Sequence, residues 1–295
     1  MADDFCKERY SIRSKPGQPA SLIISEVITL SIFSQWNFFR SQRDFYRWAK
    51  RHIQSAFPKL PDRAQYNWLV RQHHDAVVSF FLYLNQLFDA QNSLYEVLDT
   101  TGIPVRNIKR RGVGWLAGIA NIGWCTRVGW FFGFRLIVSV NREGAITGYG
   151  FAAGSAKEQP LSDDFINFRH NPNPRLLSVG EPAHNHAYLA DQGFASQVLH
   201  TRWHDLYGIN MICEPQTNRT PWPKYWRVWL HHLRQIVETT FQKLIDFFRL
   251  DKNRSHDLTG FQADLAVKIA LHNFCVWFNK QLGRSPLAFC DLLDW

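Results

Sequence analysis

The sequence has no apolar run of the length that crosses a membrane, since a spanning helix needs about 20 mostly apolar residues. The longest uncharged run, 112–126, contains several glycines and stops at Arg127, and the run 22–39 is interrupted by Glu26. The opening residues, MADDFCKERY, are acidic and polar, whereas a secretory signal is basic and then apolar. We therefore expect a cytoplasmic protein with no membrane partner.

Cysteine is scarce and scattered. The five cysteines form no CxxC pair of the kind that zinc sites and redox motifs use, so we expect buried free thiols. His200 and His204 have the spacing of two metal ligands on a helix, and His184 and His186 flank a loop. Because no nearby residue completes a tetrahedral set, ordinary histidines are favoured over a zinc site.

The composition is that of a folded, basic protein. With 295 residues and 45% hydrophobic content, the chain can bury a substantial core in one large or two modest domains. Lysine and arginine number 34 against 25 acidic residues, which gives a net charge of +9. This excess predicts a polyanionic partner, either nucleic acid or an acidic membrane surface, and charge alone does not choose between them.

The first third of the chain is helical in pattern. Residues 1–20 are polar and rich in proline and glycine, which predicts a flexible arm, and residues 21–92 predict a small helical domain that binds DNA. Helices are predicted at 21–36, 41–57 and 62–88. The second carries a basic row that either contacts phosphates or is simply a solvated surface: Arg40, Arg43, Arg47, Lys50 and Arg51.

After residue 92 the pattern changes to alternating apolar positions. Strands are predicted at 94–99, 130–140, 145–153, 187–191 and 209–213. One face of the second strand is apolar throughout: Trp130, Phe132, Phe134, Leu136, Val138 and Val140. Helices are predicted at 194–205, 225–249 and 262–282. This order predicts an α/β fold for residues 93–295, an RNase H-like mixed sheet flanked by helices.

Three acids occupy corresponding places in this fold. Asp99 and Asp191 each end a predicted strand, and Glu238 lies on the long helix that follows. A helix packed across one sheet edge can bring such carboxylates into one cluster. Hard cations such as Mg²⁺ prefer carboxylate oxygens, and two ions can activate the attacking oxygen and stabilise the leaving oxygen in phosphoryl transfer.

Basic residues accompany these acids. Arg227, His231 and Arg234 share one helix face with Glu238, an arrangement that either guides a phosphate backbone or is a surface ion pair between Arg234 and Glu238. Residues 100–135 contain no acid, so they either attract DNA or form an exposed basic loop. This stretch contains six basic residues: Arg106, Lys109, Arg110, Arg111, Arg127 and Arg135.

Four segments together resemble the catalytic core of bacterial insertion-sequence DDE transposases. They are YEVLDTTGIPV, GWFFGFRLIVSVNREGAITGYGFAAGSA, YLADQGF and LRQIVETTFQKLIDFFRL, and the leader segments LIISEVITLSIF and SQRDFYRW fit the same group. The resemblance implies that Asp99, Asp191 and Glu238 bind two Mg²⁺ ions, for which Mn²⁺ can substitute. It also implies cleavage at transposon ends, strand transfer into target DNA, terminal inverted repeats as partners, and a homodimer or larger assembly associated with the nucleoid.

The sequence departs from that family at two places. In the final motif, His231 stands where relatives carry tyrosine and Ile245 where they carry lysine, with Lys243 nearby, so the DNA contacts of those positions are open. Near Lys157, relatives often carry an aspartate. Two rival functions also fit the sequence: a metal-dependent nuclease that cuts without joining, and a domesticated DNA-binding protein without catalysis.

Overall fold

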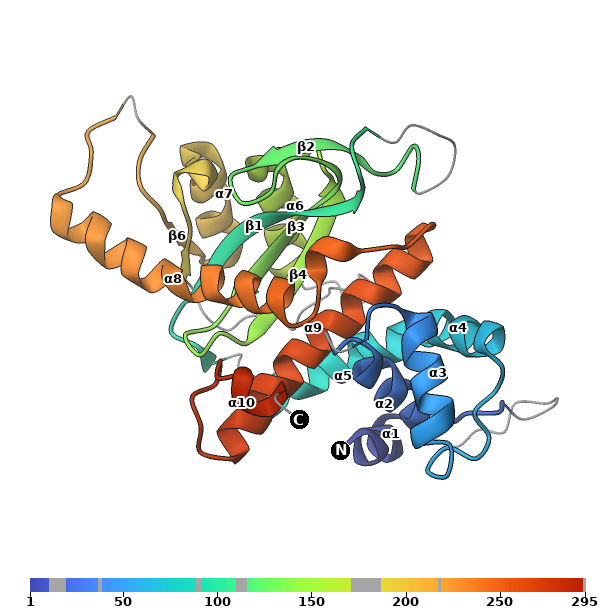
Figure 1. Ribbon diagram of the computed structural model, residues 1–295. Helices are drawn as coiled ribbons and strands as arrows, with labels where there is room; N and C mark the ends of the chain where they lie inside the picture. Colours follow the sequence, from blue (N-terminus) through green and yellow to red (C-terminus); the bar gives the residue numbers. More distant parts are fainter. Residues whose placement is uncertain are drawn as a thin grey trace.

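The computed structural model has a mixed sheet in the middle, with helices on both faces (Figure 1). It describes residues 1–10, 20–36, 39–88, 92–109, 116–170, 187–216 and 219–293. Arg110, Arg111, His184 and His186 therefore lie outside the described residues. No helix in the described ranges is both long and apolar enough to cross a membrane.

The N-terminal part is helical, as the sequence predicts. Its helices after the first are α2 (Ile24–Ser34), α3 (Gln42–His52), α4 (Arg63–Gln72) and α5 (His74–Leu87). The single helix predicted at 62–88 is thus two, because His73 leaves helical geometry with φ −107° and ψ 20°. Helices α2, α3 and α4 share a small separate core around Phe45 and Tyr66, whereas α5 packs on the central core.

The first ten residues are more ordered than a loose arm. Ala2–Arg9 form helix α1, in which Phe5 is buried against Phe80 and Tyr83 of α5. These aromatic contacts help to fix the short helix, and the polar composition of the segment gives no sign of them. The prediction of a flexible arm is therefore wrong for this helix.

In the described residues the sheet has six strands, five of them in the order β2-β3-β1-β5-β6; β4 pairs with β3 on the side away from β1, which it shares with β2. The hairpin strands β3 and β4 run antiparallel to their neighbours, and β5 and β6 run parallel to β1. This is the strand order of an RNase H-like fold, with β2 as an addition. The bounds are β1 (Glu96–Arg106), β2 (Asn121–Cys125), β3 (Gly129–Val140), β4 (Ile146–Ala153), β5 (Ala187–Leu189) and β6 (Asn210–Ile212).

Strand β1 continues well past Asp99, where the sequence predicts a turn over TGIP. Residues Thr100–Pro104 instead pair with β3. Gly102 suits this pairing because a Cβ there would lie 2.5 Å from the ring of Phe131. The glycine makes room for an aromatic ring rather than for a chain reversal.

Two hydrophobic cores cover the two faces of the sheet. On one face α5, α8 (Lys224–Asp246) and α9 (Leu258–Gln281) pack against the predicted apolar side of β3, of which Phe134 to Val140 are buried and Trp130 is exposed. On the other face lie α6 (Glu158–His170) and α7 (Gln197–Tyr207). The remaining elements are η2 (Gln192–Phe194), η3 (Leu250–Lys252) and α10 (Cys290–Leu293).

Helix α9 carries a fully buried histidine, His272. Its Nδ1 lies 3.2 Å from Asn273 Oδ1, and its ring packs edge-on against Phe289. Burial, with a smaller contribution from the charge of Lys243, lowers the pKa of His272 to about 4. The neutral ring is therefore part of the folded core.

Acid should destabilise the fold through this residue. The unfolded histidine binds its proton near pH 6.5 and the folded one only near pH 4, so the stabilising contribution is present above pH 6.5 and is lost as the pH falls towards 4. We expect His272 alone to lower the free energy of unfolding by about 2 kcal/mol between pH 7 and pH 5. Urea unfolding of the wild type and of His272→Gln at pH 7 and pH 5 should show a smaller loss of stability in the variant. Equal losses in the two proteins would mean that His272 is not the cause.

Candidate active site

The parallel pairing of β1 and β5 brings two aspartates together. Val97 lies opposite Leu189, so Asp99 and Asp191, each two residues further on, hold corresponding positions at the same edge. Asp99 Oδ1 accepts a hydrogen bond from the backbone N–H of Thr100 at 2.7 Å, and Asp191 Oδ1 accepts one from Gly193 at 2.9 Å. One oxygen of each carboxylate is thus held by backbone, and its Oδ2 is left for a cation.

Arg234 of α8 lies between the two aspartates. Its NH2 nitrogen is 3.6 Å from Asp99 Oδ2 and 3.7 Å from Asp191 Oδ2. One cationic group therefore serves both carboxylates. The surface ion pair between Arg234 and Glu238, which the helix spacing left open, is not among the contacts of the described residues, since Arg234 turns to the aspartates instead.

Glu238 lies one turn further along α8 and lines the same cavity, which has a volume of about 850 Å³. Its neighbours Val237 and Phe241 are buried and anchor this stretch of the helix, while Glu238 itself is exposed. Within the described ranges, no three His, Cys, Asp or Glu side chains converge closely enough to hold one metal ion. The three acids share a cavity, but Arg234 takes the central position, where it screens the repulsion between the two aspartates.

Burial and neighbouring charge make Asp99 hard to ionise. Burial raises the pKa of Asp99 to about 7, Arg234 opposes the rise, and the nearby charges of Asp191 and Glu158 add to it. A cation of higher charge between the aspartates would favour the ionised form. The donors are carboxylate oxygens with a shared cationic position, so the residues fit a hard divalent ion such as Mg²⁺.

A fourth acid, Glu158, belongs to this cavity, and the sequence patterns do not single it out. Its Oε1 accepts hydrogen bonds from Thr100 Oγ1 at 2.9 Å and from Arg135 at 3.1 Å. A Cβ at Gly193 would lie 2.0 Å from Glu158 Oε2, so only glycine allows this carboxylate to lie so close to the Asp191 turn. The signal in the sequence that could have identified Glu158 is the neighbouring segment around Lys157, where relatives often carry an aspartate.

The structure separates the predicted DNA-binding residues into two groups. Arg127, Arg135 and Arg234 line the cavity together with Lys157, and Arg127 donates to the backbone carbonyl of Glu238 at 3.4 Å. The second group lies elsewhere in the fold. Near β1, Arg106 stacks over Phe132, and Lys109 is exposed beyond the strand. On α8, Arg227 pairs with Glu214 and His231 is exposed. Further along α8, Lys243 lies over the ring of Phe247.

Comparison with known proteins identifies the family of this chain. The family model of the transposase DDE domain matches residues 97–274, more than half of the chain. A structure of the piggyBac transposase synaptic complex with hairpin DNA is similar at a TM-score of 0.49 and 9% identity, over 99% of this chain and 74% of that chain. A Mos1 transposase paired-end complex is similar at a TM-score of 0.22 and 10% identity, over 82% of each chain. No curated protein matches.

A sheet of this order, with carboxylates at corresponding positions of two adjacent parallel strands, is typical of the RNase H-like class of nucleases and strand transferases. Within this class the chain belongs to the transposase DDE domain family. It is a DNA transposase, an enzyme of DNA cleavage and strand transfer, and enzymes of this family generally depend on divalent metal ions.

Proposed function

We propose that Asp99, Asp191 and Glu238 are the catalytic triad of this transposase and that they bind two Mg²⁺ ions, for which Mn²⁺ can substitute. The observation that carries the proposal is the pairing of β1 with β5, which sets Asp99 beside Asp191 on the cavity that Glu238 also lines. Asp99 and Asp191 would hold the two ions, and Glu238 would complete the ligand shell of one.

The bound ions would supply activation of the attacking oxygen and charge stabilisation of the leaving oxygen. The protein's own groups orient the reactants. Backbone N–H groups fix one oxygen of each aspartate, and Arg127, Arg135 and Lys157 offer cationic contacts to a phosphodiester in the cavity. No covalent protein–DNA intermediate is needed for hydrolysis followed by attack of the freed 3′-hydroxyl.

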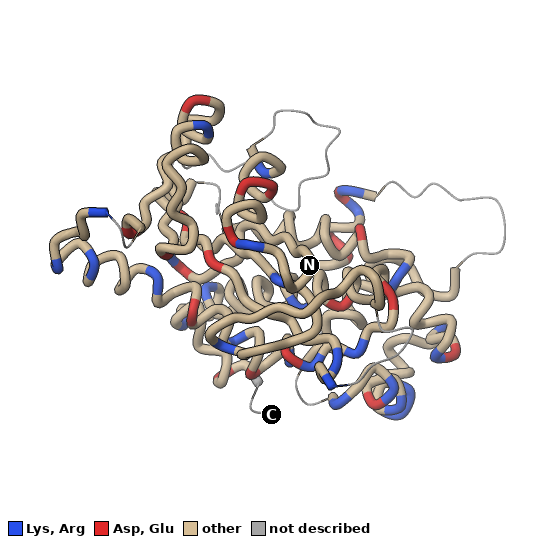
Figure 2. Tube along the Cα trace, turned by 90° about the horizontal axis from the view of Figure 1, so that it is seen from above, with Lys and Arg blue, Asp and Glu red and all other residues tan. Residues whose placement is uncertain are grey.

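The DNA partners would be the two terminal inverted repeats and the target duplex, held by a homodimer or larger assembly in the nucleoid. Figure 2 shows lysine and arginine along the projecting start of α8 and on the side formed by α3 and α4. Arg106, Lys109, Arg227, His231 and Lys243 lie outside the cavity and would contact the DNA flanks. The N-terminal helices, residues 21–92, would add a second contact region.

The products of the reaction test this function. We expect the protein, with Mg²⁺ and a labelled duplex carrying the gene's own flanking DNA, to nick the flank boundary and to yield longer, joined products with a target plasmid. Nicks without joined products would identify a nuclease. Binding without nicks would identify a domesticated DNA-binding protein.

A further inference from the structure

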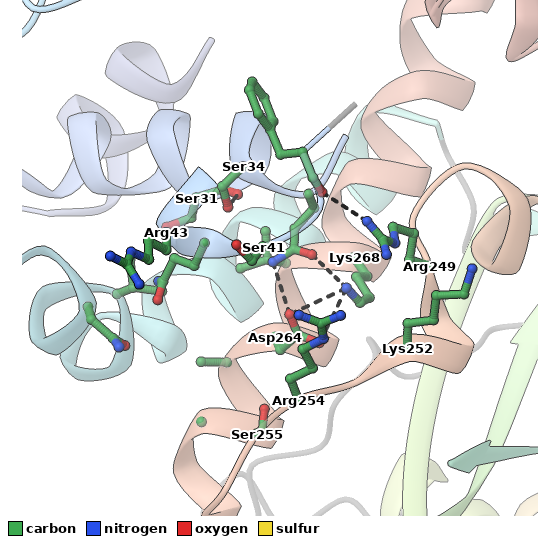
Figure 3. Close-up of a pocket in the computed structure, with 18 of the residues that line it drawn as sticks. Ser31, Ser34, Ser41, Arg43, Arg249, Lys252, Arg254, Ser255, Asp264 and Lys268 are labelled. Carbon is green, nitrogen blue, oxygen red and sulfur yellow. Dashed lines mark hydrogen bonds and ion pairs between the residues drawn. The ribbon is translucent and has the colours of Figure 1, made fainter. Parts of the chain in front are cut away.

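A second pocket, of about 360 Å³, lies between the N-terminal helices and the start of α9 (Figure 3). Helices α2 and α4 and the segment before α3 form one side, and η3 with the first turns of α9 forms the other. None of the residues that line this pocket lines the active-site cavity. The pocket is therefore a separate place on the molecule.

The pocket is strongly basic. Asp264 is the only acid among its lining residues, and it pairs with Lys268 at 3.3 Å. Arg71 pairs with Asp257, and Arg249 donates to the backbone carbonyl of Phe39. The other five cations have no carboxylate partner within the described part of the chain: Arg40, Arg43, Arg63, Lys252 and Arg254. All five are exposed to solvent, and an anion bound among them would offset their mutual repulsion.

Local backbone and hydrogen bonds hold this arrangement in place. Arg249, which follows the end of α8, has φ 55° and ψ 44°, a left-handed conformation that is costly for a residue with a Cβ. Gln35 bridges the two sides, since its amide donates to Asp264 at 3.0 Å and accepts from Lys268 Nζ at 2.6 Å. The two sides of the pocket, with the cations that they carry, are thus held together.

We propose that this basic pocket binds a phosphate group of the DNA backbone and so clamps duplex DNA between the N-terminal helices and α9. The guanidinium group of arginine matches phosphate oxygens in geometry and charge. The fold does not require five cations without a carboxylate partner at one place. This inference rests on the proposed function, because it takes the transposase's own DNA as the source of the phosphate. A free phosphate ion has the same chemistry and is the alternative source.

The test combines binding with cleavage. We compare the wild-type chain with the double variant Arg63→Gln/Arg254→Gln, which removes one cation from each side, and with Arg142→Gln, an exposed arginine on the β3–β4 turn outside the pocket. Fluorescence anisotropy with a labelled duplex carrying the gene's flanking DNA should show affinity at least about tenfold weaker in the double variant, with the slope of log K against log salt reduced by about 2. Arg142→Gln should stay near wild type.

Each outcome has one meaning. Equal affinity and salt slope in the double variant and Arg142→Gln would overturn the proposal. A second result would also overturn it: inorganic phosphate raises the Tm of the wild type but not of the double variant, while the two bind the duplex equally well. That result would assign the pocket to free phosphate. If instead the assignment of the catalytic triad is wrong, Asp191→Asn will still nick DNA and will bind it with unchanged affinity.

Discussion

Replacing Asp191 by asparagine should lower the rate of DNA nicking by about a thousandfold or more while DNA affinity stays within a few-fold. The amide keeps the shape of the side chain and can still accept the hydrogen bond from Gly193, but it loses the charge that would hold a divalent ion. Loss of about 4 kcal/mol of transition-state stabilisation corresponds to a thousandfold in rate. Single-turnover nicking of the labelled duplex with Mg²⁺ measures this effect.

The control for this variant is Asp205→Asn. Asp205 is an exposed residue of α7, its side chain is 68% exposed, and it does not line the cavity. The two variants change the net charge equally, so only the loss of a site carboxylate separates them. If Asp191→Asn nicks at the rate of Asp205→Asn, the activity belongs to another site and the triad assignment fails.

The sequence predicts much of the sheet that carries this site. Alternating apolar residues locate β3, and short apolar runs locate the start of β1 before Asp99 and β5 before Asp191, although β1 does not end at Asp99. These signals are strong because each depends on a local period or a local boundary. The RNase H-like order follows from them, since the permitted connections between strands are few.

Features that depend on contacts distant in sequence escape such patterns. Helix α6 carries Pro160 in its first turn, where a proline costs no hydrogen bond but looks like a helix breaker in the sequence. Strand β2 is mostly exposed and has no clear apolar alternation. The turn predicted after Asp99 fails because pairing with β3 overrides the local preference of TGIP.

The same limit applies to the chemistry of the site. Glu158 reaches the cavity from α6, a helix that the sequence does not predict, and its partners Thr100 and Arg135 are far away in the chain. Arg234 is visible as one member of a helix face, but its contact with two aspartates follows from how α8 crosses the sheet edge. Residue type and spacing identify candidates, and packing decides their partners.

A buried ion pair supports the two strands that carry the aspartates. Glu96 begins β1, and its Oε1 accepts from Arg169 of α6 at 2.9 Å; both side chains are almost fully buried. Arg169 also donates to Ser139 of β3 and to Tyr188 of β5, which lies opposite Glu96 in the sheet register. One guanidinium thus links β1, β3 and β5 a few residues before Asp99 and Asp191.

Arg169→Met should lower the free energy of unfolding by about 3–5 kcal/mol, because Glu96 would be left buried without a compensating charge. Urea denaturation at pH 8 measures the loss. Arg202→Met breaks the partly exposed pair with Asp163 on the same side of the sheet and should cost less than about 1 kcal/mol.

The ionic origin of this loss can be separated from lost packing. If uncompensated charge is the cause, removing the Glu96 carboxylate together with the guanidinium should restore part of the stability. The double variant Glu96→Gln/Arg169→Met should recover part of the loss at pH 8, because no buried charge remains. A deficit of the same size in the double variant would mean that the guanidinium acts through packing alone.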